Sequence, residues 1–352
     1  MRGLASVHVS KRQRTIATRR PHQDAINVRR RTLLNMARAG STKVVVIALF
    51  GNLGIAVSKF VAALISGSAA MASEGIHSLA DTANELLLLY GMRRANAPPD
   101  TEHPFGYGRE AYFWSFIVAL LIFAVGAGVS FYQGISRLRH PHTLGDLRAV
   151  YVVLAVSFVF EGISWWTAFR RIQRTKGKLG YYEAIRASKD PSVFTVFLED
   201  SAALLGLLAA LIGTVLADIT GHSQYDAAAS LAIALLLCVT SFLLARETKA
   251  LLIGEPAHSK LQRSIVEIAG TDEAIAHANG VITAQLGPNH VIAALSAEFE
   301  DSLATPAIEA CVERLEAAIK ARHPEVVALF VKPQTRKVWA ARRAKLETAS
   351  DA

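Results

Sequence analysis

The stretch that decides the fold is Ala69–Tyr90, which reads AAMASEGIHSLADTANELLLLY. As a helix rising about 1.5 Å per residue, it is long enough to cross a hydrocarbon core of about 30 Å. Its polar side chains all fall within an arc of about 100° on that helix, and the other faces are apolar. These polar positions are Glu74, His77, Asp81, Asn84 and Glu85.

A polar stripe of this kind indicates function. A carboxylate near the centre of a bilayer costs roughly 3 kcal/mol on insertion scales, so a chain keeps such groups where they bind or move something. His77 and Asp81 stand at positions i and i+4, and an imidazole and a carboxylate on one helix face suit a divalent metal. The alternative is a polar seam that holds helices together, although such a seam rarely needs three acids on one stripe.

The composition is that of a membrane protein. Hydrophobic residues make up 52% of the chain and the mean hydropathy is +0.30. The apolar runs concentrate between Val44 and Leu252. The two cysteines, Cys238 and Cys311, exclude a disulfide framework and a cysteine-rich zinc site. Six membrane spans are predicted, at about 44–66, 69–90, 112–135, 149–169, 193–216 and 227–244.

Positive charge is concentrated at the N-terminus. The net charge is +9, and residues 1–40 hold ten Lys or Arg against one acid, Asp24. This stretch lacks the interleaved aromatic residues of a nucleic-acid surface, so we interpret it as a disordered cytoplasmic flank of the first span, and expect no nucleic-acid partner. Met36 offers an alternative start, which leaves open whether residues 1–35 are native.

The distribution of basic loops predicts the orientation. Lys and Arg cluster on the side of the N-terminal tail, the second loop and the fourth loop, which places both termini in the cytoplasm. An even number of spans agrees with this. In a bacterium the membrane would be the inner, or plasma, membrane.

The composition changes after Gly254. A helix is expected over 259–269, strands over 280–286 and 290–299, a helix over 305–322 and a strand over 326–331. This αββαβ order suits a small two-layer α/β domain. The predicted divisions are therefore a tail (1–40), a six-helix membrane domain (41–253), a cytoplasmic α/β domain (254–333) and a basic tail (334–352) expected to be frayed.

Two neighbouring acids, Glu199 and Asp200, form a second candidate site in the fifth span. They lie 100° apart on a helix, so both can border one cavity but cannot both point at its centre. Asp200 can approach the stripe of span two if the helices pack closely, which the small residues Ala202, Ala203 and Gly206 would permit. The alternative places Glu199 near the membrane interface, snorkelling or protonated.

Further polar residues lie inside the predicted spans. Glu161 in the fourth span is a candidate ligand, a proton carrier or the partner of a buried cation, for which Lys59 is available. Asn52 is either an outer-shell hydrogen bonder or interhelical glue.

The loop that precedes the third predicted span is compact and rich in glycine. Asp100 and His103 in this loop make a weak candidate metal site at the cytoplasmic mouth, and a turn with a structural arginine is the alternative. No Walker motif, nucleophile elbow or HExxH is present, so the sequence predicts neither nucleotide hydrolysis nor an enzyme.

Four stretches together resemble the cation diffusion facilitator family. The resemblance covers about residues 41–333 and implies homodimers that exchange Zn²⁺ or a related divalent ion for protons. It also implies six membrane helices and a ferredoxin-like cytoplasmic domain that dimerises. The stretches are Gly51–Phe60, Ser73–Thr82, His103–Glu110, and Leu198–Ala203 with Leu251–Glu255.

The resemblance also implies a transport site. His77 and Asp81 match the family's pair in span two, and Asp200 matches its second position in span five. The first position in span five is Val196, which cannot bind metal. A Glu-Asp pair in span five is shared with the branch of mitochondrial-type zinc transporters. The fourth ligand stays open among Glu199, Glu161, Glu74 and water, and the accessory or proton-coupling candidates are Glu74, Glu161, Asn52 and Glu85.

Two further departures from the family concern its other metal sites. Tyr107 takes the place of a loop histidine often found in the family, which weakens the site at the cytoplasmic mouth. The last strand, 328–333, lacks the His and Asp ligands of the family's binuclear C-terminal zinc site. We therefore expect the C-terminal domain to dimerise without a tightly bound metal cluster.

The sequence thus predicts an antiporter that moves a divalent metal out in exchange for protons. Protons compete with the metal for neutral imidazole and ionised carboxylates, which allows one to be traded for the other. Zn²⁺ is the preferred ion, although one imidazole with carboxylates also admits Fe²⁺, Mn²⁺ or Co²⁺. No permanently bound cofactor is expected. The alternatives are a non-transporting membrane protein whose C-terminal domain binds a partner, and a proton-coupled exporter of an organic cation.

Overall fold

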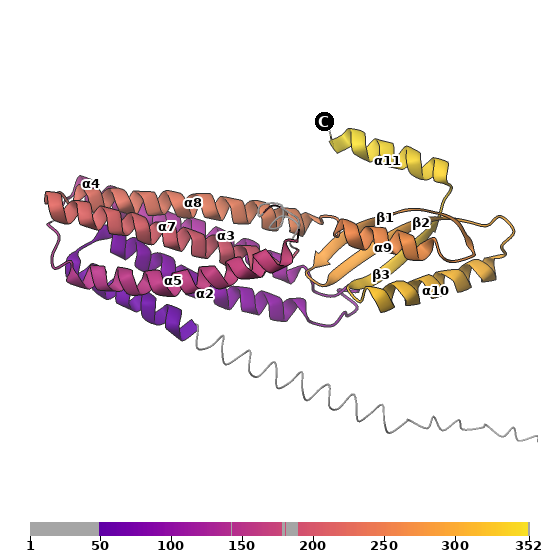
Figure 1. Ribbon diagram of the computed structural model, residues 1–352, viewed down its shortest axis with the longest axis horizontal. Helices are drawn as coiled ribbons and strands as arrows, with labels where there is room; N and C mark the ends of the chain where they lie inside the picture. The colour runs from indigo at the N-terminus through magenta and orange to yellow at the C-terminus, as the bar shows by residue number, and fades with distance from the viewer. Residues whose placement is uncertain (1–48, 142, 178–179, 181–188, 351–352) are drawn as a thin grey trace, which may run out of the picture. The chain divides into compact units, whose positions relative to one another are not determined.

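The computed structural model describes residues 49–141, 143–177, 180 and 189–350 (Figure 1). The predicted N-terminal tail, 1–40, which includes Met36, lies outside these residues. Residues Asn52–Ala352 form one compact unit, and every site discussed below lies in it.

Long helices dominate the first two thirds of the chain. Among the described residues, five are long and apolar enough to cross a membrane by length and composition. The chain is therefore an integral, multi-pass membrane protein. These helices are Leu49–Ser66, the continuous segment Glu110–Arg139, α5 (Arg148–Thr175), α7 (Pro191–Thr220) and α8 (Gln224–Ile253).

The helix α2 (Ala69–Ala95) is the sixth long helix, and it carries the polar stripe quoted above. Its charged side chains explain why it is less apolar than its neighbours. It packs against α3 (Glu110–Leu121), α4 (Gly128–Arg139), α7 and α8, so the stripe lies inside the bundle. The predicted six-helix membrane fold is confirmed.

The segment between α3 and α4 departs from α-helical geometry. Ile122–Ala127 forms the π-helical stretch η1, with Gly126 close to Leu237 of α8. A π-bulge inserts one residue into a helix without breaking it, and periodicity in an apolar run does not reveal it.

The helix ends follow ordinary capping rules. The Asp190 side chain accepts a hydrogen bond from the Ser192 N–H, and Pro191 occupies the first position of α7. Gly221 and Gly254 end α7 and α8 with φ of 71° and 113°, a conformation that glycine adopts without strain. The N-terminus of α2 is capped by Ser68.

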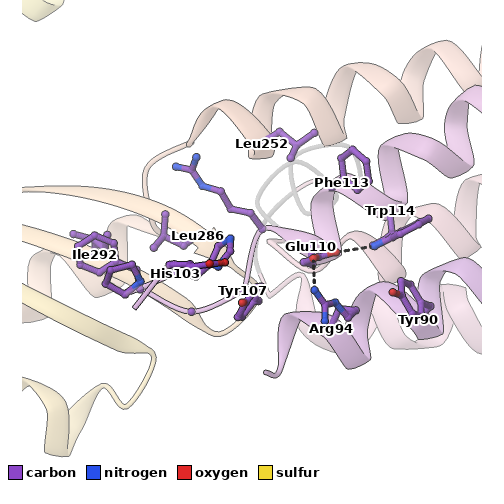
Figure 2. Close-up of a pocket in the computed structure, with 15 residues that line it drawn as sticks. Tyr90, Arg94, His103, Tyr107, Glu110, Phe113, Trp114, Leu252, Leu286 and Ile292 are labelled. Carbon is purple, nitrogen blue, oxygen red and sulfur yellow. Dashed lines mark hydrogen bonds and ion pairs between the residues drawn. The ribbon is translucent and has the colours of Figure 1, made fainter. Parts of the chain in front are cut away.

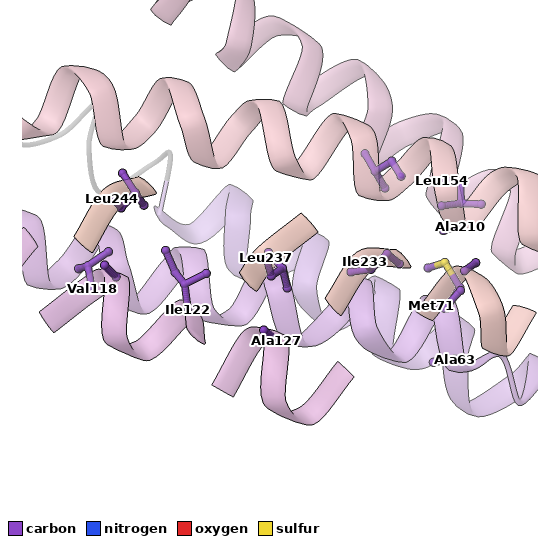
Figure 3. Close-up of a cluster of buried hydrophobic side chains, with 14 of the residues drawn as sticks. Ala63, Met71, Val118, Ile122, Ala127, Leu154, Ala210, Ile233, Leu237 and Leu244 are labelled. Atoms are coloured by element: carbon purple, nitrogen blue, oxygen red, sulfur yellow. The ribbon is translucent and has the colours of Figure 1, made fainter. Parts of the chain in front are cut away.

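The apolar core of the bundle draws on several of the elements around α2. Figure 3 shows Met71 of α2, Ile122 of η1, Leu154 of α5, Ala210 of α7 and Leu237 of α8, which all belong to one buried cluster. Small residues at these contacts let the helices approach closely. Large apolar side chains on the outer faces are exposed, as expected for surfaces that meet lipid.

The C-terminal part is the predicted αββαβ domain. It consists of α9 (Ser259–Ala269), β1 (Ile275–Gly287), β2 (His290–Phe299), α10 (Thr305–Arg322) and β3 (Val326–Pro333). The sheet order is β1-β2-β3, with β1 and β2 antiparallel and β2 and β3 parallel. Its core is separate from that of the bundle.

The end of the chain differs from the expectation of a frayed tail. Residues Arg336–Ser350 form the helix α11. Trp339 of this helix covers Gly280 of β1, where a Cβ would overlap the indole. A glycine in β1 and a tryptophan about 60 residues later therefore fit together, which a composition-based reading of a basic tail could not detect.

Candidate metal site in the helix bundle

His77 and Asp81 lie side by side on α2, as their spacing predicts. Asp81 Oδ1 is 3.3 Å from His77 Nδ1, and the two side chains are 2% and 21% exposed. Within the described part of the chain, neither ring nitrogen of His77 has a hydrogen-bond partner, and neither has Asp81 Oδ1. Buried polar atoms are nearly always satisfied, so this group of atoms is suited to receive a ligand.

Glu199 points from α7 toward α2. Asn84 Nδ2 donates a hydrogen bond of 2.9 Å to Glu199 Oε1, and the Glu199 side chain is buried. Glu199 is therefore inside the bundle, and the alternative of a side chain snorkelling to the interface does not fit this geometry. Asn84 belongs to the predicted stripe, but only the packing of α2 on α7 reveals that it orients Glu199.

Asp200 points in a different direction from its neighbour. Its Oδ2 accepts a hydrogen bond of 2.7 Å from Ser164 Oγ of α5. The divergence follows from the 100° step between consecutive helix residues. Ser164 escaped the sequence analysis because a single serine in an apolar helix carries little signal.

Two further acids, Glu161 and Glu85, lie near the residues of the candidate site. Glu161 of α5 lies close enough to Asp81 and Asp200 to interact with them electrostatically. Glu85 Oε2 accepts a hydrogen bond of 3.2 Å from Asn52 Nδ2, which gives Asn52 an orienting role toward an acid of the stripe.

Glu74 forms an ion pair with Lys59 instead of contacting the other acids. Its Oε2 is 3.0 Å from Lys59 Nζ, and neither side chain has any exposed area. Lys59 Nζ also donates a hydrogen bond of 2.7 Å to Ser78 Oγ. The buried cation proposed above as a partner for Glu161 is thus in direct contact with Glu74 instead.

The side chains of the predicted ligands lie in one region, but they do not converge on a single position that a metal ion could occupy. Among the residues that the structure describes, no three His, Cys, Asp or Glu side chains are arranged to hold a metal. His77 and Asp81 form one pair on α2, while Glu199 and Asp200 diverge from α7 toward different helices. A ligand sphere that uses both helices requires new side-chain rotamers or a shift of α7 on α2.

The loop candidate, Asp100 and His103, has the geometry of a turn. Asp100 Oδ1 accepts the backbone N–H groups of Glu102 and His103, and Oδ2 accepts the Tyr107 hydroxyl at 2.6 Å. These hydrogen bonds, led by that of Tyr107, hold the pKa of the Asp100 carboxyl below its usual range. His103 Nδ1 is 3.5 Å from Asp100 Oδ1, and both side chains are about half exposed.

This loop borders a cavity of about 760 Å³. Figure 2 shows His103 and Tyr107 on one side and Arg94, Glu110 and Trp114 on the other. Glu110 accepts hydrogen bonds from Arg94 at 3.4 Å and from Trp114 at 2.8 Å. Gly108 lies against Gly287 at the β1–β2 turn, where a Cβ on either glycine would meet the other's backbone.

Comparison with known proteins identifies the bundle. Residues 45–253 match the cation efflux transmembrane domain. This range lies within the predicted six-helix domain, 41–253, and contains both the stripe of α2 and the acids of α7.

Individual relatives also have names that refer to metals. The chain is 36% identical over 275 residues to the proton-coupled zinc antiporter SLC30A9, mitochondrial, of Xenopus laevis, covering 77% of this chain and 49% of that protein. It is 30% identical over 237 residues to metal tolerance protein C4 of Arabidopsis thaliana, covering 67% and 52%. It is 26% identical over 228 residues to the manganese efflux system protein MneP of Bacillus subtilis, covering 63% and 71%. The chain spans about half the length of the curated relatives it matches at 36% identity.

Proposed function

The chain belongs to the cation diffusion facilitator family, and we propose that it moves a divalent metal, Zn²⁺ before others, across a membrane in exchange for protons. The observation that carries this proposal is the pair His77 and Asp81, whose facing atoms are buried and without hydrogen-bond partners among the described residues. An imidazole nitrogen and a carboxylate oxygen are donors that Zn²⁺ prefers.

The other acids supply the rest of the site. We assign Asp200 as the third ligand, since it reaches the region of Asp81 once it leaves Ser164. Glu199 is the leading fourth ligand because it is buried beside the same stripe and is held there by Asn84. A metal bound by both side chains together with those of α2 would bring α7 closer to α2.

Exchange with protons follows from the donor types. Metal binding requires neutral imidazole and ionised carboxylates, so protons and metal compete for the same atoms. Transport also requires that each ion bind one membrane-facing state more tightly than the other. A metal that binds Glu199 and Asp200 together would have to displace their hydrogen bonds to Asn84 and Ser164, and its release would let these bonds form again.

The choice of metal rests on chemistry and on relatives. One imidazole with several carboxylates admits Zn²⁺, Fe²⁺, Co²⁺ and Mn²⁺. The names of the relatives include a zinc antiporter and a manganese efflux protein. We place Zn²⁺ first because the relatives at 36% identity carry zinc in their name.

The assembly and orientation are part of the same proposal. We infer a homodimer joined through the C-terminal domain, with both termini in the cytoplasm and the metal entering from that side. The basic loops on the side of the C-terminal domain support this orientation.

The proposal is tested by metal-driven proton flux in proteoliposomes that enclose a pH-sensitive dye. Zn²⁺, Fe²⁺, Mn²⁺ and Co²⁺ are added in turn to the wild-type protein, to Asp81→Asn and to Asp218→Asn. The last is a matched control, because Asp218 bonds Tyr151 at the far end of α7. We expect flux with Zn²⁺ that is lost in Asp81→Asn and kept in Asp218→Asn.

Other outcomes would redirect the assignment. Absence of proton flux with every metal, from folded protein, would contradict metal–proton exchange and favour the partner-binding and organic-cation alternatives. Proton flux driven by an organic cation in the same liposomes, with no response to metals, would select the second of these.

A further inference from the structure

The ion pair of Lys59 and Glu74 is the most deeply buried charge pair described in the bundle. Lys59 comes from the helix Leu49–Ser66 and Glu74 from α2, and their side chains are both 0% exposed. Lys59 also donates to Ser78 at 2.7 Å. Buried charges persist when they are paired and hydrogen-bonded, because an unpaired partner would be strongly destabilising. The pair is therefore a fixed part of the membrane domain.

The second oxygen of Glu74 is confined by α7. Glu74 Oε1 has no hydrogen-bond partner among the described residues. It lies against Gly206, where a Cβ would overlap it. Glycine at this position of α7 therefore makes the space that the carboxylate occupies, and Glu74 is held between the ammonium group of Lys59 and the α7 backbone.

The pair adjoins the proposed metal site. Glu74 precedes His77 by one helical turn, and the charges of both Glu74 and Lys59 act on His77. Lys59 also interacts electrostatically with Glu161. Without the ammonium group, Glu74 would be one more free carboxylate beside the imidazole.

We propose that Lys59 is a specificity-determining residue, which withholds Glu74 from the metal and so limits the number of carboxylates that the ion meets. The inference rests on the proposed metal site. Carboxylate oxygens favour harder ions such as Mn²⁺, while imidazole suits Zn²⁺. A released Glu74 would shift the preference toward Mn²⁺. It would also hold any bound ion more tightly, and so slow its release.

The test compares metal binding and transport in four proteins: the wild type, Lys59→Met, Glu74→Gln and the double variant Lys59→Met/Glu74→Gln. Titration calorimetry on the full chain in detergent gives the dissociation constants for Zn²⁺ and Mn²⁺. Lys59→Met is expected to raise the affinity for Mn²⁺ relative to Zn²⁺ about tenfold, which corresponds to about 1.4 kcal/mol. Glu74→Gln and the double variant should keep the wild-type ratio to within about twofold. In proteoliposomes Lys59→Met should lower both kcat and KM, and the double variant should restore both.

Several outcomes would overturn the inference. An unchanged ratio of Mn²⁺ affinity to Zn²⁺ affinity in folded Lys59→Met would do so, because removal of the ammonium group would then not change which metal the site prefers. Loss of Zn²⁺ binding in Glu74→Gln would make Glu74 a ligand instead. If Lys59→Met does not fold, Lys59→Gln replaces it in the comparison, because glutamine removes the charge and keeps a hydrogen-bond donor for Ser78. The expected binding pattern without transport in any protein would support the role of Lys59 and contradict the proposed antiport.

Discussion

Adjacent residues can have unrelated partners in a helix bundle, and Glu199 and Asp200 illustrate this. Glu199 accepts a hydrogen bond from Asn84 of α2, whereas Asp200 accepts one from Ser164 of α5. Ser164 holds Asp200 with one hydrogen bond from a neutral hydroxyl, which a divalent cation can displace more readily than it displaces a buried ion pair. Under the proposed function, Asp200 is therefore well placed to exchange its hydrogen bond with Ser164 for a bond to the metal.

The first prediction at this scale is that Asp200→Asn lowers metal-dependent proton flux at saturating Zn²⁺ by at least about tenfold, because the amide lacks the charge that the metal requires. Asp218→Asn makes the same chemical change on the same helix, about 27 Å further along at 1.5 Å per residue. It should leave the flux within about twofold of the wild type. Full flux in folded Asp200→Asn would remove Asp200 from the ligand set.

The residues differ in how far the sequence alone could place them. The contact of His77 with Asp81 follows from spacing within one helix and needs no knowledge of neighbours. The pairing of Lys59 with Glu74 depends on how two helices are rotated against each other, which hydrophobic periodicity does not determine in a bundle that is apolar on nearly every face. For that reason Lys59 could be identified as an available cation, but its partner could not.

At the scale of elements, Asp226 connects two helices that are distant in sequence. Its carboxylate accepts hydrogen bonds from the Ser68 hydroxyl and from the N–H groups of Ala69 and Ala70, and it is 2% exposed. An acid in the first turn of α8 therefore caps the N-terminus of α2, where the helix dipole favours negative charge. The sequence analysis missed it, since an acid at the start of a span is usually interpreted as a cap of its own helix.

Loss of this cap should destabilise the membrane domain. We expect Asp226→Ala to lower the free energy of unfolding by about 1–3 kcal/mol, since it leaves buried N–H groups of α2 unsatisfied. Thermal unfolding of the full chain in detergent, followed by circular dichroism, measures the effect. Asp218→Asn serves again as a comparison at an exposed carboxylate, and its melting temperature should stay close to that of the wild type. Equal melting temperatures for Asp226→Ala and the wild type would contradict the capping role.

The C-terminal domain contains an ion pair that links α10 to the turn before β1. Arg314 donates two hydrogen bonds to Asp272, of 3.1 and 2.9 Å. The hydrogen bonds from the Arg314 guanidinium hold the pKa of the Asp272 carboxyl below its usual range. A carboxyl with a lowered pKa in the folded state stabilises the fold above its unfolded pKa of about 3.9, and this stabilisation is lost as the pH falls through the folded pKa.

The resulting prediction concerns acid sensitivity. Arg314→Gln should lower the urea midpoint of the C-terminal domain at pH 7, and the difference from the wild type should shrink as the pH falls toward about 3. Burial raises the pKa of the Cys311 thiol to about 11, so this buried thiol reacts only after unfolding. Its labelling by dithiodipyridine in a Cys238→Ala background, at pH 7, 5 and 3.5, therefore reports on this domain. A difference that stays constant across this range would exclude the Asp272 pair as its cause.

At the scale of the whole chain, the sequence predicted the order of elements better than the contacts between them. The strand β2 and the helices α9 and α10 have the predicted bounds, because each has turn or breaker residues at its ends. The strand β1 starts earlier than predicted, at Ile275, and passes through an irregularity next to Gly280. The indole of Trp339 packs against the backbone at this irregularity. The position of α11 therefore depends on a tertiary contact that local composition does not reveal.

The contact of Gly108 with Gly287 also bears on orientation. It requires the loop before α3 and the C-terminal domain to be on the same side of the membrane. The short connection between α7 and α8, 221–223, lies at the opposite ends of α7 and α8 from this domain, because α8 leads directly into it. With both termini in the cytoplasm, the loop before α3 should be cytoplasmic and the connection 221–223 should face outward.

Single cysteines at exposed positions test this arrangement. We expect a membrane-impermeant maleimide, added to intact cells, to label His222→Cys but not Thr101→Cys, each in a background with Cys238 and Cys311 replaced by alanine. Permeabilised cells should label both, which controls for reactivity. Inside-out vesicles should reverse the pattern of the intact cells. Labelling of Thr101→Cys alone in intact cells would invert the orientation, and metal would then enter the site from the opposite side to that proposed.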